Sequence, residues 1–158
     1  VAALALGLVS LGGVLGQIWI GQFSDRMGRE WAWTLSGIGF LLTYAALYLL
    51  RLWPEPWLMY AMVLVQGALG YGLASVFGSV PADLFSGRRY GQIFGVLAAA
   101  AGGGAAAGPW LTGVMFDRSQ SYDGAFGVAM VVALISIAAM WLAAPRKVRL
   151  VSGQIPPE

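Results

Sequence analysis

Side chains capable of specific ionic chemistry gather in two short polar segments, residues 21–29 and 81–91. The first reads Gly-Gln-Phe-Ser-Asp-Arg-Met-Gly-Arg, and the second reads Pro-Ala-Asp-Leu-Phe-Ser-Gly-Arg-Arg-Tyr-Gly. An aspartate is stabilised beside a helix amino end, and an arginine bonds carboxylates or phosphates through two parallel N–H groups. We therefore expect contacts that hold helix ends together and can release them. The residues expected to form these contacts, or the tight turns beside them, are Gly21, Asp25, Arg26, Gly28, Arg29, Asp83, Arg88 and Arg89.

The composition excludes several kinds of catalytic and metal site. The chain has 158 residues and contains no His and no Cys. This removes Ser-His-Asp catalysis, cysteine nucleophiles, and zinc or iron–sulfur centres held by those ligands. Ser36 and Ser75 lie in apolar sequence without a neighbouring base or carboxylate, so we expect no enzyme, no catalytic residue, no metal and no cofactor. The net charge of +2 is too small to indicate nucleic acid as a partner.

The elements that position these residues follow from the spacing of charge. Charged residues are 10% of the chain, against about 25% in soluble domains. They leave five uncharged stretches, each long enough for the roughly 20 residues that cross a bilayer. The pattern predicts an all-α, polytopic membrane helical bundle over residues 1–145, with a tail at 146–158; five successive buried helices of a soluble core are the alternative. The predicted spans are residues 1–24, 31–50, 56–82, 90–116 and 124–145.

The basic residues predict how the chain threads the membrane. Lys and Arg collect in short loops that face the cytoplasm. Of the nine basic residues, seven lie in the first connector, the third connector and the tail, and two lie in the others. We therefore expect the loops at 25–30 and 83–89 and the tail to be cytoplasmic and the amino end to be outside. The expected location is the plasma (inner) membrane, with the lipid bilayer as a partner.

A few polar side chains lie within the predicted spans and are candidates for lining a cavity. Gln17 lies four residues from Gly13, and Gln66 lies four residues from Gly70, so each shares a helix face with a small residue. Small residues mark close helix contacts in membranes, so both glutamines are expected to face the bundle. Hydrogen bonding between helices is the alternative to contact with a ligand. The cavity candidates are Gln17, Gln66, Tyr71 and Thr112.

Glycine is abundant, with 23 residues, and the run 98–108 contains only Ala and Gly. Pro109 follows this run and removes one backbone hydrogen bond, so a helix kink is expected at Gly108 and Pro109. The glycines indicate either close helix packing or a bending element used in a conformational change.

The first polar segment resembles the signature loop of the major facilitator superfamily through its Gly-x-x-x-Asp-Arg-x-Gly-Arg spacing. The second segment, with Ile93-Phe94-Gly95 after it, is similar to the loop between spans ten and eleven of monocarboxylate and organic-anion carriers. The stretch 108–113, with Phe116-Asp117 and Ser121-Tyr122, resembles span eleven and its outer loop in those carriers. In the family the signature loop occurs twice, after the second and the eighth of twelve spans.

The resemblance implies that the chain is part of a secondary active transporter that moves a small solute, a monocarboxylate or another organic anion, by alternating access. No long cytoplasmic loop follows the fifth stretch and no arginine lies in the third, so the chain is placed as spans eight to twelve rather than two to six. The chain, which begins with Val, then looks like a fragment, and the missing amino-terminal half is its expected partner. It departs from the organic-anion carriers in having no basic residue within stretches 1–24 and 90–116. A non-transporting membrane scaffold or accessory subunit is the alternative function.

Overall fold

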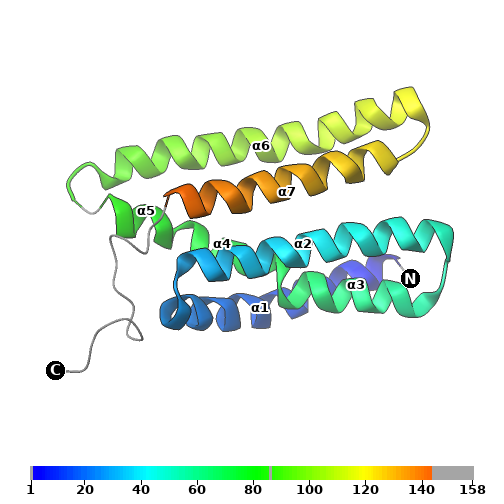
Figure 1. Ribbon diagram of the computed structural model, residues 1–158, viewed down its shortest axis with the longest axis horizontal. Coiled ribbons are helices and arrows are strands. Elements are labelled where there is room, and N and C mark those ends of the chain that lie inside the picture. Colours follow the sequence, from blue (N-terminus) through cyan, green and yellow to red (C-terminus); the bar gives the residue numbers. More distant parts are fainter. Residues whose placement is uncertain (1, 86, 144–158) are drawn as a thin grey trace.

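The structure is a computed structural model that describes residues 2–85 and 87–143, with side chains described from residue 7 onward (Figure 1). The tail predicted at 146–158 lies outside the described residues. Within the described ranges the chain is all helical, with turns and no strand. The elements are α1 (Ala2–Met27), α2 (Arg29–Leu52), α3 (Pro56–Ala68), the 3₁₀ turn η1 (Gly70–Gly72), α4 (Leu73–Phe77), α5 (Ser79–Leu84), α6 (Tyr90–Ser119) and α7 (Asp123–Ala143).

Four segments of the described chain are long and apolar enough to cross a membrane: Arg29–Leu52, Pro56–Leu84, Tyr90–Ser119 and Asp123–Ala143. They correspond to the second to fifth predicted stretches, and the all-α polytopic fold class is confirmed. The first predicted span falls on α1, a helix of 26 residues. Its crossing of the membrane, and with it the count of five spans, stays a prediction.

The turn between α1 and α2 is shorter than the predicted connector at 25–30. Residues 25–27 complete the last turn of α1, and α2 begins one residue after Gly28. Gly28 has φ 108°, a conformation that side chains with a Cβ rarely adopt, and its N–H donates to the Ser24 carbonyl at 3.0 Å. A single glycine therefore reverses the chain and places the charged residues inside helical turns.

The third stretch is not the one regular helix that the sequence predicted over 56–82. It is interrupted after α3 by the η1 turn, and again at Gly78 between α4 and α5. Glycines at 67, 70, 72 and 78 lower the helix propensity of this segment. Gly72 also packs so closely that an added Cβ would lie 2.4 Å from Ile20 Cγ1. The backbone follows this close packing through a short 3₁₀ turn.

Helices α1, α2 and α3 lie together, and α7 joins them along α2, with α6 beside α7 (Figure 1). The main buried cluster takes one residue from each of five helices: Ile20, Ala32, Val76, Val80 and Met140. A second, smaller cluster holds Val9 and Val63 where α1 meets α3. The core therefore lies between α1, α2, α4, α5 and α7.

Glycines allow α1 and α3 to approach backbone to backbone. A Cβ on Gly16 would lie 2.2 Å from the Gly67 carbonyl oxygen, and one on Gly12 would lie 3.4 Å from Gly67 Cα. Two helices this close gain van der Waals contact along their backbones, which is how small residues drive association in membranes. Of the two interpretations of the glycines, close helix packing agrees with this geometry at Gly12 and Gly16.

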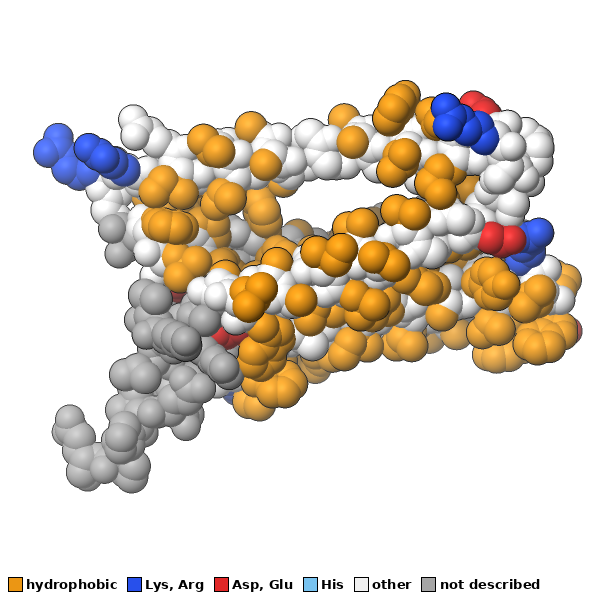
Figure 2. Space-filling view, turned by 45° about the horizontal axis from the view of Figure 1, so that its top comes forward, with side chains coloured by type: hydrophobic (Ala, Val, Ile, Leu, Met, Phe, Trp, Pro, Cys, Tyr) orange, Lys and Arg blue, Asp and Glu red, His pale blue; other side chains and the backbone are white. Residues whose placement is uncertain are grey.

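Helix α6 has a different environment, because none of its described residues is buried. Its glycines at 91, 95, 102, 103, 104, 108 and 113 have no heavy atom within 4 Å of an added Cβ. The helix runs unbroken through Pro109, and the kink predicted at Gly108 and Pro109 stays a prediction. Hydrophobic side chains cover the visible sides of the molecule, while charged side chains lie at its two ends (Figure 2).

Candidate functional site

An ionic cluster joins the two polar segments at one end of the bundle, and Arg29 is its centre. The Arg29 guanidinium donates from Nε to Asp83 Oδ2 at 3.0 Å and from one terminal nitrogen to Ser24 Oγ at 2.9 Å. The same terminal nitrogen lies 2.9 Å from Asp25 Oδ1. The Arg29 side chain is 11% exposed and that of Asp83 is 17% exposed, whereas that of Asp25 is 61% exposed. One arginine thus ties the start of α2 to the end of α1 and to α5.

The structure brings together Asp25, Arg29 and Asp83 of the predicted ionic set. The side chains of Arg26, Arg88 and Arg89 are exposed at the same end. Gly28 forms the turn beside the cluster, while Gly21 lies inside α1 in ordinary contact with Ser75. Gly21 therefore lies outside the tight turn between α1 and α2, to which the sequence analysis had assigned it together with Gly28.

Glu30 belongs to this end of the bundle, although the sequence analysis gave it no role. It lies in the first turn of α2 with 1% of its surface exposed. An acidic side chain is favourable there because the helix amino end carries partial positive charge. In the sequence, the position of Glu30 directly after Arg29 was the feature that could have indicated its place in this cluster.

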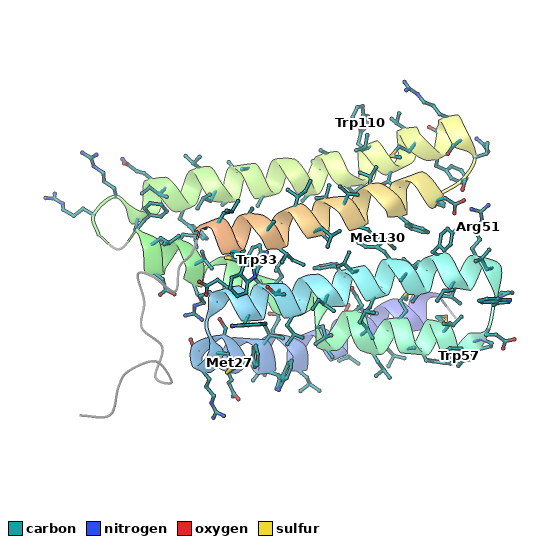
Figure 3. All side chains as sticks on the ribbon, viewed as in Figure 1. Met27, Trp33, Arg51, Trp57, Trp110 and Met130 are labelled. Carbon is teal, nitrogen blue, oxygen red and sulfur yellow. The ribbon has the colours of Figure 1, made fainter. Side chains whose placement is uncertain are left out.

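A second polar contact joins two helix ends at the opposite end of the bundle. Arg51 at the end of α2 forms an ion pair with Asp123 at the start of α7 and donates to Ser121 Oγ at 3.0 Å. Figure 3 shows Arg51 between the ends of these two helices. The pair is exposed, so it adds little stability, but it fixes which helix ends are neighbours.

The first of two adjoining cavities lies between α2, the interrupted third segment and α6. Its volume is about 560 Å³, and its lining is almost wholly apolar among the described residues. Gln66 supplies an amide and Tyr71 a phenol to this lining, and both were among the predicted cavity residues. The lining residues are Phe40, Gln66, Gly70, Tyr71, Leu73, Ala74, Phe77 and Ala101.

The second cavity lies between α2, α6 and α7 and measures about 710 Å³. It shares Phe40 and Leu73 with the first cavity, so the two cavities adjoin at these side chains. Thr112, the third predicted candidate, lines it together with Gly108 and Pro109. The Thr112 hydroxyl already donates to the Gly108 carbonyl at 2.9 Å, so its proton is used within the helix. Tyr44 and Tyr122 form the aromatic part of the wall.

Two outcomes at the cavities differ from the expectation. Gln17, the fourth candidate, is half-buried on α1 and lines neither of the two cavities. Phe40 and Thr43 on α2 were not singled out, although Phe40 lines both cavities and Thr43 contacts Gln66. For Thr43, the four-residue spacing from Gly39 was the available signal.

The sequence model of the Major Facilitator Superfamily matches residues 1–157 of the chain. The chain is 37% identical over 108 residues to the class B tetracycline resistance protein of Escherichia coli, and 32% identical over 96 residues to the class C protein of the same organism. These matches cover 68% and 61% of this chain, but only 26% and 23% of the relatives. The chain therefore spans about a quarter of the length of these relatives. No solved structure gave a significant match.

The family match extends over both polar segments and both cavities, and it agrees with an all-helical fold whose long apolar helices carry charge at their ends. This match is to the superfamily as a whole, and it does not show the resemblance to organic-anion carriers. The chain belongs to the major facilitator superfamily.

Proposed function

We propose that the chain forms spans eight to twelve of a twelve-span secondary active transporter and moves a small solute by alternating access. The observation that carries this proposal is the pair of adjoining cavities, because they run between helices of a family whose members place solute sites between bundles. Their volumes fall within the range of about 300–1,000 Å³ that is typical of small-molecule sites. The missing amino-terminal half would supply the opposite wall.

The lining favours a solute with a broad apolar surface and few polar groups. Phe40, Tyr71 and Phe77 surround the first cavity, and no charged side chain of the described chain lines either cavity. A monocarboxylate or other organic anion would need a basic partner, which would have to come from the amino-terminal half. The names of the two relatives make tetracycline a suitable first test solute, since it is polycyclic and carries hydroxyl and amide groups.

The ionic cluster at Arg29 suits a role in gating. Contacts that hold helix ends together at one rim and then separate are what alternating access requires. Arg26, Arg88 and Arg89, exposed beside the cluster, would bind acidic groups of the amino-terminal half when that side is closed. This end would face the cytoplasm, with the amino end of the chain outside, in the plasma membrane.

The test is transport by the full-length protein that contains this chain, reconstituted in vesicles with an imposed proton gradient. Uptake of tetracycline and of lactate is measured in parallel for the parent and for Ala74→Trp, which fills the first cavity. The control is Ala139→Trp on the exposed face of α7. We expect the parent and the control to take up at least one of the two solutes with saturable kinetics. Ala74→Trp should take up that solute at least tenfold more slowly. Equal rates in all three proteins would remove the cavity from the solute path.

The non-transporting scaffold remains the second candidate function, because the Gly-mediated contact of α1 and α3 suits helix assembly as well as transport. Failure of the parent to move any solute under a proton, sodium or exchange gradient, with normal folding, would favour it.

A further inference from the structure

The contacts of Gln66 determine which end of its amide faces the first cavity. Thr43 Oγ1 lies 2.8 Å from the Gly39 carbonyl oxygen and 2.9 Å from one end of the Gln66 side-chain amide. Thr43 is buried, with 7% of its surface exposed. If that end of the amide were its carbonyl oxygen, both neighbours would be acceptors, yet a threonine hydroxyl has only one proton. It cannot donate fully to both.

One arrangement satisfies both contacts. Threonine inside a helix commonly donates to the carbonyl four residues earlier, which here is Gly39. The hydroxyl oxygen then still accepts, and the group at 2.9 Å must be a donor. The oxygen and nitrogen of an amide side chain are assigned from such networks rather than seen directly. Turning the Gln66 amide over lets Nε2–H donate to Thr43 Oγ1 and removes the conflict between two acceptors.

Gly70 holds the amide in this place. A Cβ on Gly70 would lie 2.7–3.0 Å from all three outer atoms of the Gln66 amide, its carbon, oxygen and nitrogen, so the amide lies flat against the glycine backbone. Gly70 is buried at the start of the η1 turn and lines the same cavity. With Thr43 binding one end of the amide and Gly70 behind it, only the other end is left for the cavity.

We infer that Gln66 presents its carbonyl oxygen to the cavity and selects uncharged solutes that carry an O–H or N–H donor. The inference rests on the proposed function and names the substrate class of that site. Phe40, Tyr71 and Phe77 supply the apolar surroundings for such a solute. A carboxylate is disfavoured, since its oxygens would face a carbonyl oxygen with no cation of the described chain in the lining.

The test compares two aromatic probes of nearly the same shape, 2-naphthol and 2-methoxynaphthalene, of which only the first has an O–H donor. Their binding to the full-length protein in lipid nanodiscs is measured by probe fluorescence, with empty nanodiscs as blanks. One hydrogen bond predicts about fivefold tighter binding of 2-naphthol. In Gln66→Leu this ratio should fall to about one, with the affinity for 2-methoxynaphthalene unchanged or higher.

Two threonine variants test the hold on the amide itself. Thr43→Val removes the acceptor for Nε2–H and should lower the ratio, whereas Thr43→Ser keeps the hydroxyl and should keep the ratio. The matched control is Thr34→Val on the same helix, because Thr34 also donates to the carbonyl four residues earlier and lines neither cavity, so it should leave the ratio unchanged. If Gln66→Leu fails to fold, the contrast between Thr43→Val and Thr43→Ser still decides the question.

A parental ratio near one, or a ratio that survives both Gln66→Leu and Thr43→Val, overturns the inference and leaves the transporter proposal intact. Failure of the parent to move any solute under a proton, sodium or exchange gradient, with the 2-naphthol preference present, overturns the transporter proposal and leaves the amide orientation standing.

Discussion

At the scale of single residues, Arg29 shows how one side chain can join three segments of the chain. Its guanidinium contacts Ser24, Asp25 and Asp83, the last of them 54 positions away. The two aspartates differ in surroundings, because Asp83 is largely enclosed and Asp25 is open to solvent. Their contributions should therefore differ, although both carry the same charge.

Asp83→Asn should destabilise the protein more than Asp25→Asn. Charge-assisted hydrogen bonds between enclosed groups contribute about 1.5–3 kcal/mol, whereas exposed ion pairs contribute about 0–1 kcal/mol. The two variants are compared by their thermal unfolding temperatures in the full-length protein in detergent, with unfolding monitored by intrinsic tryptophan fluorescence. An equal loss of stability in the two variants would contradict the placement of Asp83 as the main partner of Arg29.

The sequence was enough to predict which charged residues lie at the helix ends. It was not enough to predict all the residues that they contact. The spacing of Asp25 and Arg29 is local, so their contact follows from helical periodicity once α1 is known. The contact between Arg29 and Asp83 depends on how α5 packs, which no local spacing encodes. The turned amide of Gln66 is a further case, because it needs the position of Thr43 on another helix.

At the scale of elements, the third segment carries most of the departure from the sequence prediction. A hydropathy pattern registers apolar length, and residues 56–82 have that length. It does not register a 3₁₀ turn, because glycine is compatible with a membrane helix and its effect depends on the neighbouring helix. The break between α3 and α4 places Gly70, Tyr71 and Leu73 around the first cavity. The irregular backbone thus borders a cavity, where such backbone is tolerated in membranes.

Gly16→Ala should disrupt the contact of α1 with α3. The added methyl would meet the carbonyl oxygens of Gly67 and Ala68 at 2.2 Å and 2.8 Å, and backbone atoms cannot rotate away as a side chain would. Overpacking of this kind costs about 1–3 kcal/mol. Unfolding temperature and yield of monodisperse protein are the measurements.

Gly102→Ala is the matched control for that substitution. It adds the same methyl to α6, where nothing lies within 4 Å of the new atom, and alanine favours helix over glycine by up to about 1 kcal/mol. The control should unfold at the parental temperature or higher. A loss of stability equal to that of Gly16→Ala would show that the close approach of α1 and α3 is not the cause.

At the scale of the whole molecule, the charges pair by end. The first and third connectors meet through Arg29 and Asp83, and the second and fourth meet through Arg51 and Asp123. Antiparallel threading requires this arrangement, because alternate connectors must lie on the same side of the membrane. The positions of charge in the sequence were therefore enough to predict the polytopic class, while the cavities needed the packing of α2 against the third segment.

Single-cysteine labelling tests the threading, and the chain itself contains no cysteine to interfere. In intact cells, an impermeant maleimide should label Glu55→Cys and Arg118→Cys and should label Arg26→Cys and Arg88→Cys only after the cells are opened. The positive-inside rule is the physical basis of this orientation. Labelling of Glu55→Cys and Arg88→Cys from the same side would contradict it.

The central claim is that the cavity lined by Phe40, Gln66 and Tyr71 receives the solute, and solute protection of a cysteine in its wall tests this most directly. Ala74 lines that cavity, whereas Ala68 on the same segment lines the groove between α1 and α3. In the full-length protein, a solute that the protein transports should slow methanethiosulfonate labelling of Ala74→Cys severalfold and leave Ala68→Cys unaffected. Protection of neither position, or equal protection of both, by that solute would contradict the account.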